Sequence, residues 1–199
     1  MKIDTKALIA KSEKNLKEEL EALRLLVFPQ VNEVLDFRVD DEVYKLEPKA
    51  IQKQKLLPPR GNQVIYILRF IDQFQTAEDL EFLRKEAQQV KQKDHDGHRQ
   101  VTGIKDKNWE YQLKNLKNVT LYTGSSKAFP SRLREHIGWA NKGTATLLLR
   151  KWPSLMNRRF KVTFNYFDFG PEIGSAAIKY IEYHMANELR PLIGHNRIA

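Results

Sequence analysis

The residues best suited to chemistry are two tyrosines and four polar side chains spread over the last two thirds of the chain. They are Tyr66, Tyr122, Arg132, His136, Glu182 and Asn196. Hydroxyl groups, a guanidinium and a carboxylate could together support attack of water on a phosphodiester. That reaction needs a deprotonated water, neutralisation of phosphate charge and help for the leaving oxygen. Each residue alone also has an ordinary explanation, because strand tyrosines usually pack and helical Arg or Glu side chains usually face solvent.

The composition of the chain excludes some kinds of site and favours some kinds of partner. The 199 residues include 34 Lys and Arg against 25 Asp and Glu, a formal net charge of +9, and no cysteine. The missing cysteines exclude disulfides, thiolate nucleophiles and Cys-bound zinc. The positive charge favours a polyanionic partner such as nucleic acid, although a membrane surface or simple solubility could also account for it. With no apolar run long enough to cross a bilayer, we expect a cytoplasmic protein of bacterial or phage origin.

The chain divides into an N-terminal arm, residues 1–60, and a core, residues 61–199. Apolar residues at three- and four-residue steps predict an amphipathic helix over residues 5–28. Four prolines and a glycine within residues 29–61 indicate a connecting arm with little regular structure. This helix could cover the core or pair with a second copy, since both uses need the same apolar stripe.

We expect the core to contain both strands and helices. We expect strands at residues 64–70, 119–122 and 160–169, with the second strand closed by Gly124, and helices at 76–91, 131–141, 144–151 and 174–189. Between the first helix and the second strand, residues 91–118 are rich in Lys, Arg and His with few apolar anchors. We expect this segment to be a basic, mobile loop that leaves the core and returns to it.

Two short tyrosine motifs give the pattern its specificity. Val64-Ile65-Tyr66 lies in the first strand and Tyr122-Thr123-Gly124 in the second, followed in order by Arg132, His136, Glu182 and Asn196. Over about residues 61–198 the sequence resembles the GIY-YIG nuclease family, and most of all its stand-alone restriction endonucleases. The resemblance implies an α+β fold, with a small core in which helices flank a short, mainly antiparallel sheet. The helical arm and an insertion at about residues 71–118 elaborate this core here.

The resemblance also implies roles for the six residues. Glu182 would bind a single divalent cation, and one carboxylate completed by waters and phosphate oxygens suits Mg²⁺, with Mn²⁺ as a substitute. Tyr66 and Tyr122 would lie beside the scissile phosphate, one helping to deprotonate the water. Because a free tyrosine is a poor base at neutral pH, Tyr66 needs a cationic neighbour, and Arg132 could supply it while also holding a phosphate oxygen. His136 would hydrogen-bond a tyrosine hydroxyl or the phosphate, and Asn196 would position neighbouring groups.

The sequence departs from the family in two places. Val64 replaces the first glycine of the motif, which the backbone should tolerate. The spacing differs more, because Tyr66 and Tyr122 are far apart in the chain, whereas the family joins these strands by a short hairpin. Tyr111 is an alternative to Tyr122 as the partner of Tyr66, but no glycine follows it at the required position.

Basic residues provide candidates for DNA contacts. Those we assign to phosphate or groove contacts are Arg99, Lys105, Lys107, Lys114, Lys142, Arg158 and Arg159. The alternative is a solvated loop that only keeps the protein soluble. We expect a metal-dependent endonuclease acting on double-stranded DNA, with a homodimer as the simplest way to cut both strands. A structure-selective or nicking nuclease, or a non-catalytic binding protein on the same scaffold, remain alternatives.

Overall fold

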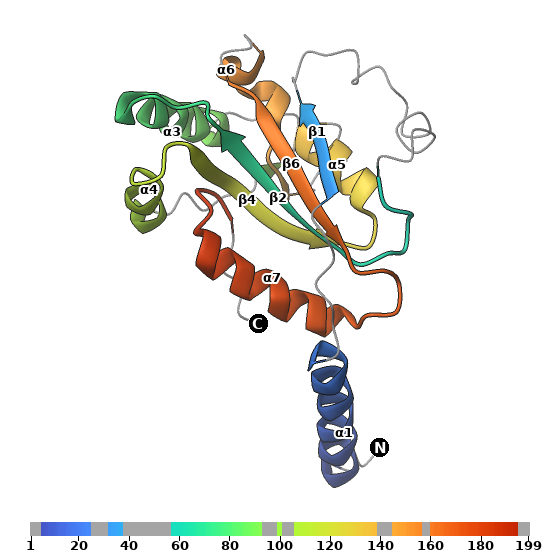
Figure 1. Ribbon diagram of the computed structural model, residues 1–199. Helices are drawn as coiled ribbons and strands as arrows, with labels where there is room; N and C mark the ends of the chain where they lie inside the picture. The colour runs from blue at the N-terminus through green and yellow to red at the C-terminus, as the bar shows by residue number, and fades with distance from the viewer. Residues whose placement is uncertain are drawn as a thin grey trace.

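A computed structural model describes residues 5–24, 32–37, 57–92, 99–100, 106–138, 145–156 and 160–194. Its centre is a four-stranded antiparallel sheet with the order β1-β6-β2-β4. The strands are β1 (Asn32–Phe37), β2 (Val64–Ile71), β4 (Asn118–Ser126) and β6 (Val162–Asp168). Helices surround this sheet (Figure 1), which confirms the α+β fold class.

Strand β2 is the inner strand on which the site depends. Its sequence VIYILRFI is rich in β-branched and aromatic residues, and seven of its eight residues are buried or half-buried. In the register of its two neighbours, Tyr66 lies opposite Gly124 of β4 and Tyr166 of β6. Residues that face each other across strands point to the same side of a sheet, so Tyr66 and Gly124 share one face.

The two faces of the sheet carry separate hydrophobic cores. On the face of Tyr66 lie α3 (Ala77–Gln92), α5 (Phe129–Ile137) and α6 (Pro153–Met156), packed through Leu83, Leu133 and Leu155. The opposite face is covered by α7 (Ser175–Leu189), where Ile178 and Ile181 pack with Ile65 of β2. In Figure 1, α7 crosses the sheet on the side away from α5.

The predicted N-terminal helix is confirmed as α1 (Thr5–Arg24), which ends before the predicted residue 28. It extends away from the sheet, with one end beside α7 (Figure 1). Three residues of its apolar stripe, Ile9, Leu16 and Leu20, are 59%, 60% and 51% exposed, so the stripe does not cover the core. Among the described residues, no helix has the length and apolar character needed to cross a bilayer.

The prediction of a structureless connecting arm is wrong for residues 32–37. Strand β1 pairs antiparallel with β6, with Asn32 opposite Tyr166 and Phe37 opposite Val162. Strand β6 would otherwise present an unpaired edge, and β1 supplies its partner. The sheet thus includes a segment from residues 1–60, and a domain division at residue 60 stays a prediction.

The insertion is more ordered than its composition suggests. Helix α3 is confirmed, and its start is capped reciprocally, because the Asp79 amide donates to Thr76 Oγ1 and the Thr76 amide donates to Asp79 Oδ2. The prediction of a loop over residues 91–118 is wrong for its second half, where helix α4 (Asp106–Gln112) forms and buries Trp109 and Gln112. The short strand β3 (Arg99–Gln100) pairs in parallel with β5 (Ala145–Thr146). Residues 93–98 and 101–105 lie outside the described part.

Several elements differ from the sequence-based expectations in their bounds or in their type. Helix α5 begins two residues earlier than expected and ends at Ile137, because Gly138 takes a positive φ of 127° that stops the helix. The helix predicted over residues 144–151 is wrong. That region holds β5 and the 3₁₀ turn η2 (Leu149–Lys151), with Leu148 at a φ of 50° before it. Strand β4 continues through Gly124 to Ser126 instead of turning there.

Candidate active site

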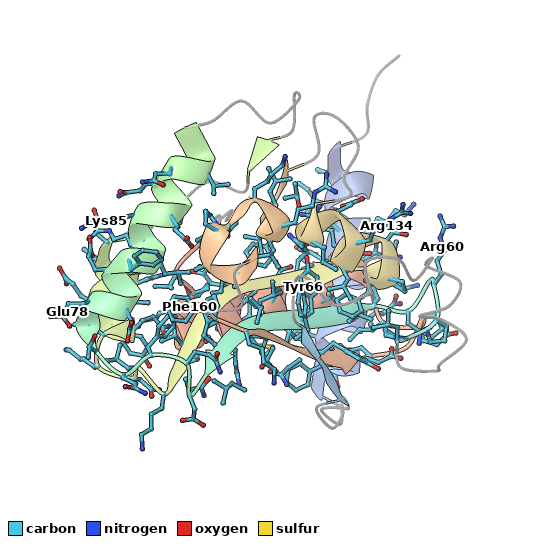
Figure 2. The ribbon with its side chains drawn as sticks, turned by 90° about the horizontal axis from the view of Figure 1, so that it is seen from above. Arg60, Tyr66, Glu78, Lys85, Arg134 and Phe160 are labelled. Atoms are coloured by element: carbon cyan, nitrogen blue, oxygen red, sulfur yellow. The ribbon has the colours of Figure 1, made fainter. Side chains whose placement is uncertain are left out.

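Tyr66, Tyr122 and His136 come together on the face of the sheet covered by α5. The Tyr66 hydroxyl lies 2.8 Å from His136 Nε2. The rings of Tyr66 and Tyr122 are 6.1 Å apart between centroids, and those of Tyr122 and His136 are 5.0 Å apart. Figure 2 shows Tyr66 in the interior, between the sheet and the helices above it. Strand β2 therefore joins β4 and α5, which are distant from it in the chain, in one cluster of polar aromatic groups.

In the structure, Tyr122 and not Tyr111 lies beside Tyr66. Tyr111, the alternative, lies in α4 with 37% of its surface exposed, and the Arg190 guanidinium stacks 4.5 Å from its ring centroid. Tyr66 instead contacts Tyr122 through the pairing of β2 with β4. The long separation in the chain is bridged by this strand pairing.

His136 is buried and its hydrogen bonds indicate its tautomer. The Leu147 amide donates to His136 Nδ1 at 3.4 Å, so Nδ1 acts as an acceptor. Burial, together with the charge of Arg132, holds the pKa of His136 well below its usual value, and the ring is neutral at pH 7. A neutral ring that accepts at Nδ1 carries its proton on Nε2, and Nε2–H then donates to the Tyr66 hydroxyl oxygen.

The environment of the two tyrosines raises both of their pKa values. Burial is the largest cause for Tyr66, whose pKa lies well above 10, and the neighbouring Tyr122 raises it further. The pKa of Tyr122 is also raised, chiefly by burial. Arg132 lowers both values, as its charge predicts, but burial outweighs it. Both side chains are therefore phenols at neutral pH in this structure.

Arg132 comes from the first half of α5, one turn before His136. Helical spacing of four residues places both side chains on one side of the helix, as the sequence predicts. The guanidinium forms an ion pair with Glu135 at 2.7 Å and is 22% exposed. Burial lowers the pKa of Arg132, but the nearby Tyr66 and Glu135 more than offset this, and the group stays fully charged. It is a fixed cation beside the two tyrosines.

Glu182 approaches from α7, on the opposite face of the sheet. It accepts a hydrogen bond from Ser125 Oγ at 2.5 Å and forms an ion pair with Lys179 Nζ at 2.6 Å. Its charge raises the pKa of both Tyr66 and Tyr122, so the carboxylate lies within electrostatic reach of the tyrosine cluster. Strand β4 is an edge strand of the sheet. Side chains from its two faces, such as Tyr122 and the Ser125–Glu182 pair, can therefore approach each other past the free edge.

The donor set around Glu182 suits a hard divalent cation. Within the described ranges there is no group of three or more His, Asp or Glu side chains arranged to hold a metal ion. A single carboxylate leaves the remaining positions to water and phosphate oxygens, which is how Mg²⁺ is usually bound in phosphoryl-transfer sites. Glu182 is the residue that would hold such an ion.

Several predicted site residues lie outside the described part of the chain. They are Asn196, Lys105, Lys142, Arg158 and Arg159, and nothing is described of the Arg99 side chain. Gly194, two residues before Asn196, is placed so that a Cβ on it would contact the Tyr122 ring at 3.9 Å. The chain thus passes beside the tyrosine cluster just before Asn196. Lys107 in α4 and Lys114 just after it are exposed.

Sequence reasoning missed four neighbours of the cluster. Phe129 packs against Tyr66 with ring centroids 5.0 Å apart, and Glu135 pairs with Arg132. Ser125 and Lys179 both contact Glu182. The spacing of three residues on predicted helices could have suggested the pairs Arg132–Glu135 and Lys179–Glu182. The contacts of Phe129 and Ser125 depend on tertiary structure.

The comparison with protein families agrees with this geometry. Residues 107–197 match the family model of the GIY-YIG catalytic domain. The match begins after β2, so it includes Tyr122, Arg132, His136 and Glu182 but does not reach Tyr66. No curated protein and no solved structure matches the chain significantly. Residues 107–197 therefore resemble a GIY-YIG catalytic domain, which implies a nuclease that hydrolyses phosphodiester bonds.

Proposed function

We propose that this protein is a divalent-metal-dependent DNA endonuclease of the restriction type, cutting double-stranded DNA at a specific sequence. The observation that carries the proposal is the convergence of Tyr66, Tyr122, His136 and Arg132 with the Glu182 carboxylate around the edge strand β4. This combination provides a fixed positive charge, a metal-binding carboxylate and hydroxyl groups within one small region. Those are the groups that hydrolysis of an anionic diester requires.

Arg132 and Glu182 supply the electrostatic part of the proposed reaction. A divalent cation bound at Glu182 would neutralise phosphate charge and make a bound water more acidic. The planar guanidinium of Arg132 suits a phosphate oxygen, whose negative charge increases in the transition state. Its ion pair with Glu135 keeps the guanidinium on the side of α5 that faces the tyrosines.

Tyr66 is the group to which we assign removal of the proton from the attacking water. The hydrogen bond from His136 Nε2–H and the charge of Arg132 both stabilise a phenolate at Tyr66. Burial opposes this, so the reactive form is a minor species at neutral pH. Tyr122, which lies beside Tyr66 on the neighbouring strand, would orient the water or the phosphate.

The decisive experiment compares cleavage by the wild type and by Glu182→Ala. Supercoiled and phage-length DNA is incubated with Mg²⁺, with Mn²⁺ or with EDTA, at matched protein concentrations. We expect discrete, metal-dependent fragments from the wild type and none from the variant. Glu188→Ala is the matched control, since Glu188 is an exposed glutamate further along α7, and it should cut like the wild type.

The pattern of products separates the proposal from its alternatives. Discrete fragments support sequence-specific cutting, whereas conversion of supercoiled DNA to open circles without linear product supports a nicking nuclease. Salt-sensitive DNA binding without cleavage under any metal condition would point to a binding protein and contradict the proposal. The exposed Lys107 and Lys114 are proposed phosphate contacts, and their substitution should weaken DNA binding at every sequence alike.

We also propose that the protein cuts both strands as a homodimer joined through α1. Three apolar residues of this helix, Ile9, Leu16 and Leu20, are exposed, and the helix extends away from the sheet. A site with one metal-binding carboxylate cuts one strand at a time, so a second copy is the simplest source of the second cut. Light scattering should give twice the mass of the chain, and Leu16→Glu should reduce it to the mass of one chain.

A further inference from the structure

The carboxylate of Glu182 is held on one of its two oxygens. Ser125 Oγ–H donates to Oε2 at 2.5 Å, and Lys179 Nζ lies 2.6 Å from the same atom. In the part of the chain that the structure describes, no hydrogen bond to Oε1 accompanies them. The Glu182 side chain is 20% exposed.

The two groups that contact Glu182 Oε2 lie on different elements and differ in rigidity, since Ser125 belongs to β4 and Lys179 to α7. Ser125 lies opposite Ile65 in the ladder between β2 and β4, one residue after the glycine that faces Tyr66. Its side chain is therefore on the face of the sheet that α7 covers, and the paired backbone holds it in place. Lys179 lies one helical turn before Glu182 and is 66% exposed, with a long flexible side chain.

We propose that Ser125 is the positioning residue for the metal ligand of this site. Its hydrogen bond fixes the Glu182 carboxylate with Oε2 turned toward the strand and Oε1 presented to the divalent cation. Outer hydrogen bonds of this kind orient ligating carboxylates and tune metal affinity. The inference rests on the proposed function, in which Glu182 binds the metal.

Lys179 has the opposite effect on metal binding. Its ammonium group pairs with Oε2 and would repel a cation bound to the same carboxylate. Removal of the Ser125 hydroxyl should therefore lower the metal affinity, whereas removal of the Lys179 charge should raise it. A role confined to packing would not produce opposite signs.

The test measures Mn²⁺ binding to the full-length protein without DNA, by electron paramagnetic resonance of the free ion. Ser125→Ala removes the hydroxyl and should weaken binding 10- to 100-fold. Ser125→Thr keeps the hydroxyl on a strand residue and should bind within a few-fold of the wild type. Lys179→Met keeps the length of the side chain without its charge and should tighten binding a few-fold.

Matched controls keep the result interpretable. Ser126→Ala removes a hydroxyl from the next residue of β4, where the Ser126 Oγ accepts from the Ala128 amide instead of contacting Glu182, and it should bind Mn²⁺ like the wild type. Thermal unfolding of every variant checks that it is folded. Cleavage titrated with Mg²⁺ should show a higher half-saturating concentration for Ser125→Ala, with most of the rate recovered at saturating metal.

Failure of this inference can be told apart from failure of the proposed function. If the wild type binds Mn²⁺ and Glu182→Ala does not, but Ser125→Ala binds as tightly as the wild type, Ser125 does not position the ligand. Equal weakening by Ser125→Ala and Lys179→Met would overturn the inference as well. If the wild type neither binds Mn²⁺ nor cuts DNA, the proposed function itself fails.

Discussion

Gly124 faces Tyr66 across β2 and β4, and a Cβ on residue 124 would lie 2.7 Å from the Tyr66 hydroxyl. The same Cβ would lie 2.8 Å from Tyr122 Cε1. Both distances are shorter than real carbon contacts, so the glycine makes room for the two rings. The requirement for glycine in this motif is therefore steric, since the residue lies within a regular strand at a site where two side chains meet.

The first prediction concerns Gly124→Ala. The added methyl group should displace one or both tyrosine rings, lower the free energy of unfolding by about 1–3 kcal/mol and abolish detectable cleavage. Urea unfolding and a cleavage assay measure the two effects. Thr123→Ala, one residue earlier on the opposite face of the strand, should retain cleavage. Full activity in Gly124→Ala would show that the close approach of residue 124 to the rings is unimportant.

The second prediction compares three tyrosines by removing one hydroxyl from each. Tyr66→Phe and Tyr122→Phe keep their rings packed, so the loss of stability should be limited to about 1–3 kcal/mol for Tyr66→Phe, which leaves the buried His136 Nε2–H without its partner, and should be smaller for Tyr122→Phe. Cleavage should fall by roughly 10²-fold or more in both, as expected when a group that assists proton transfer is lost. Tyr111→Phe is the matched control and should cut like the wild type. Equal loss in all three variants would contradict the assignment of Tyr66.

The third prediction follows from the raised pKa of Tyr66. If its phenolate accepts the proton of the attacking water, the cleavage rate should rise with pH through pH 9, since the phenolate fraction increases while pH stays below the pKa. Rates at saturating metal and DNA between pH 6 and 9 provide the test. A rate that falls or stays level above pH 7 would exclude Tyr66 as the base.

The fourth prediction links His136 to acid stability. Its pKa is depressed in the folded protein, so the unfolded chain binds a proton more readily as pH falls below about 6.5. The stability that the neutral ring contributes is present above that pH and is lost toward lower pH, at up to about 1.4 kcal/mol per pH unit. Urea midpoints from pH 7.5 to 5 should fall more steeply for the wild type than for His136→Gln. Parallel curves would refute this origin.

The fifth prediction tests whether α4 belongs to the core. The Gln112 amide donates to the Leu189 and Arg190 carbonyls at 2.7 and 2.9 Å, and its oxygen accepts from the Thr120 amide at 3.1 Å. Gln112→Ala would remove the partner of the buried Thr120 amide and of two partly buried carbonyls, and we expect a loss of about 1–3 kcal/mol in unfolding free energy. The exposed Glu110→Ala in the same helix should cost little. A similarly small loss in Gln112→Ala would mean that α4 is not needed to hold the end of α7.

Local pattern was sufficient to predict the main helices and three of the four strands of the main sheet. The β-branched and aromatic content of β2 reflects a strand that is buried, and the apolar spacing of α3, α5 and α7 reflects the face that each helix buries. The same reasoning placed Arg132 and His136 on one side of a helix. It failed for β1 and α4, because Asn32–Phe37 becomes a strand through pairing with β6, and the polar Gln112 anchors its helix through distant carbonyl groups.

The sequence by itself determined which side chains are present, their order and the helices and strands that carry most of them, since these depend on interactions between near neighbours. Tertiary structure alone decided that Tyr122, and not Tyr111, meets Tyr66, that Gly124 lies under both rings and that Ser125 reaches Glu182. These relationships arise from the register of β2 with β4 and the packing of α7 on the sheet. Backbone hydrogen bonds between paired residues that lie 47 to 62 positions apart in the chain set that register, and they leave no periodic signal in either segment.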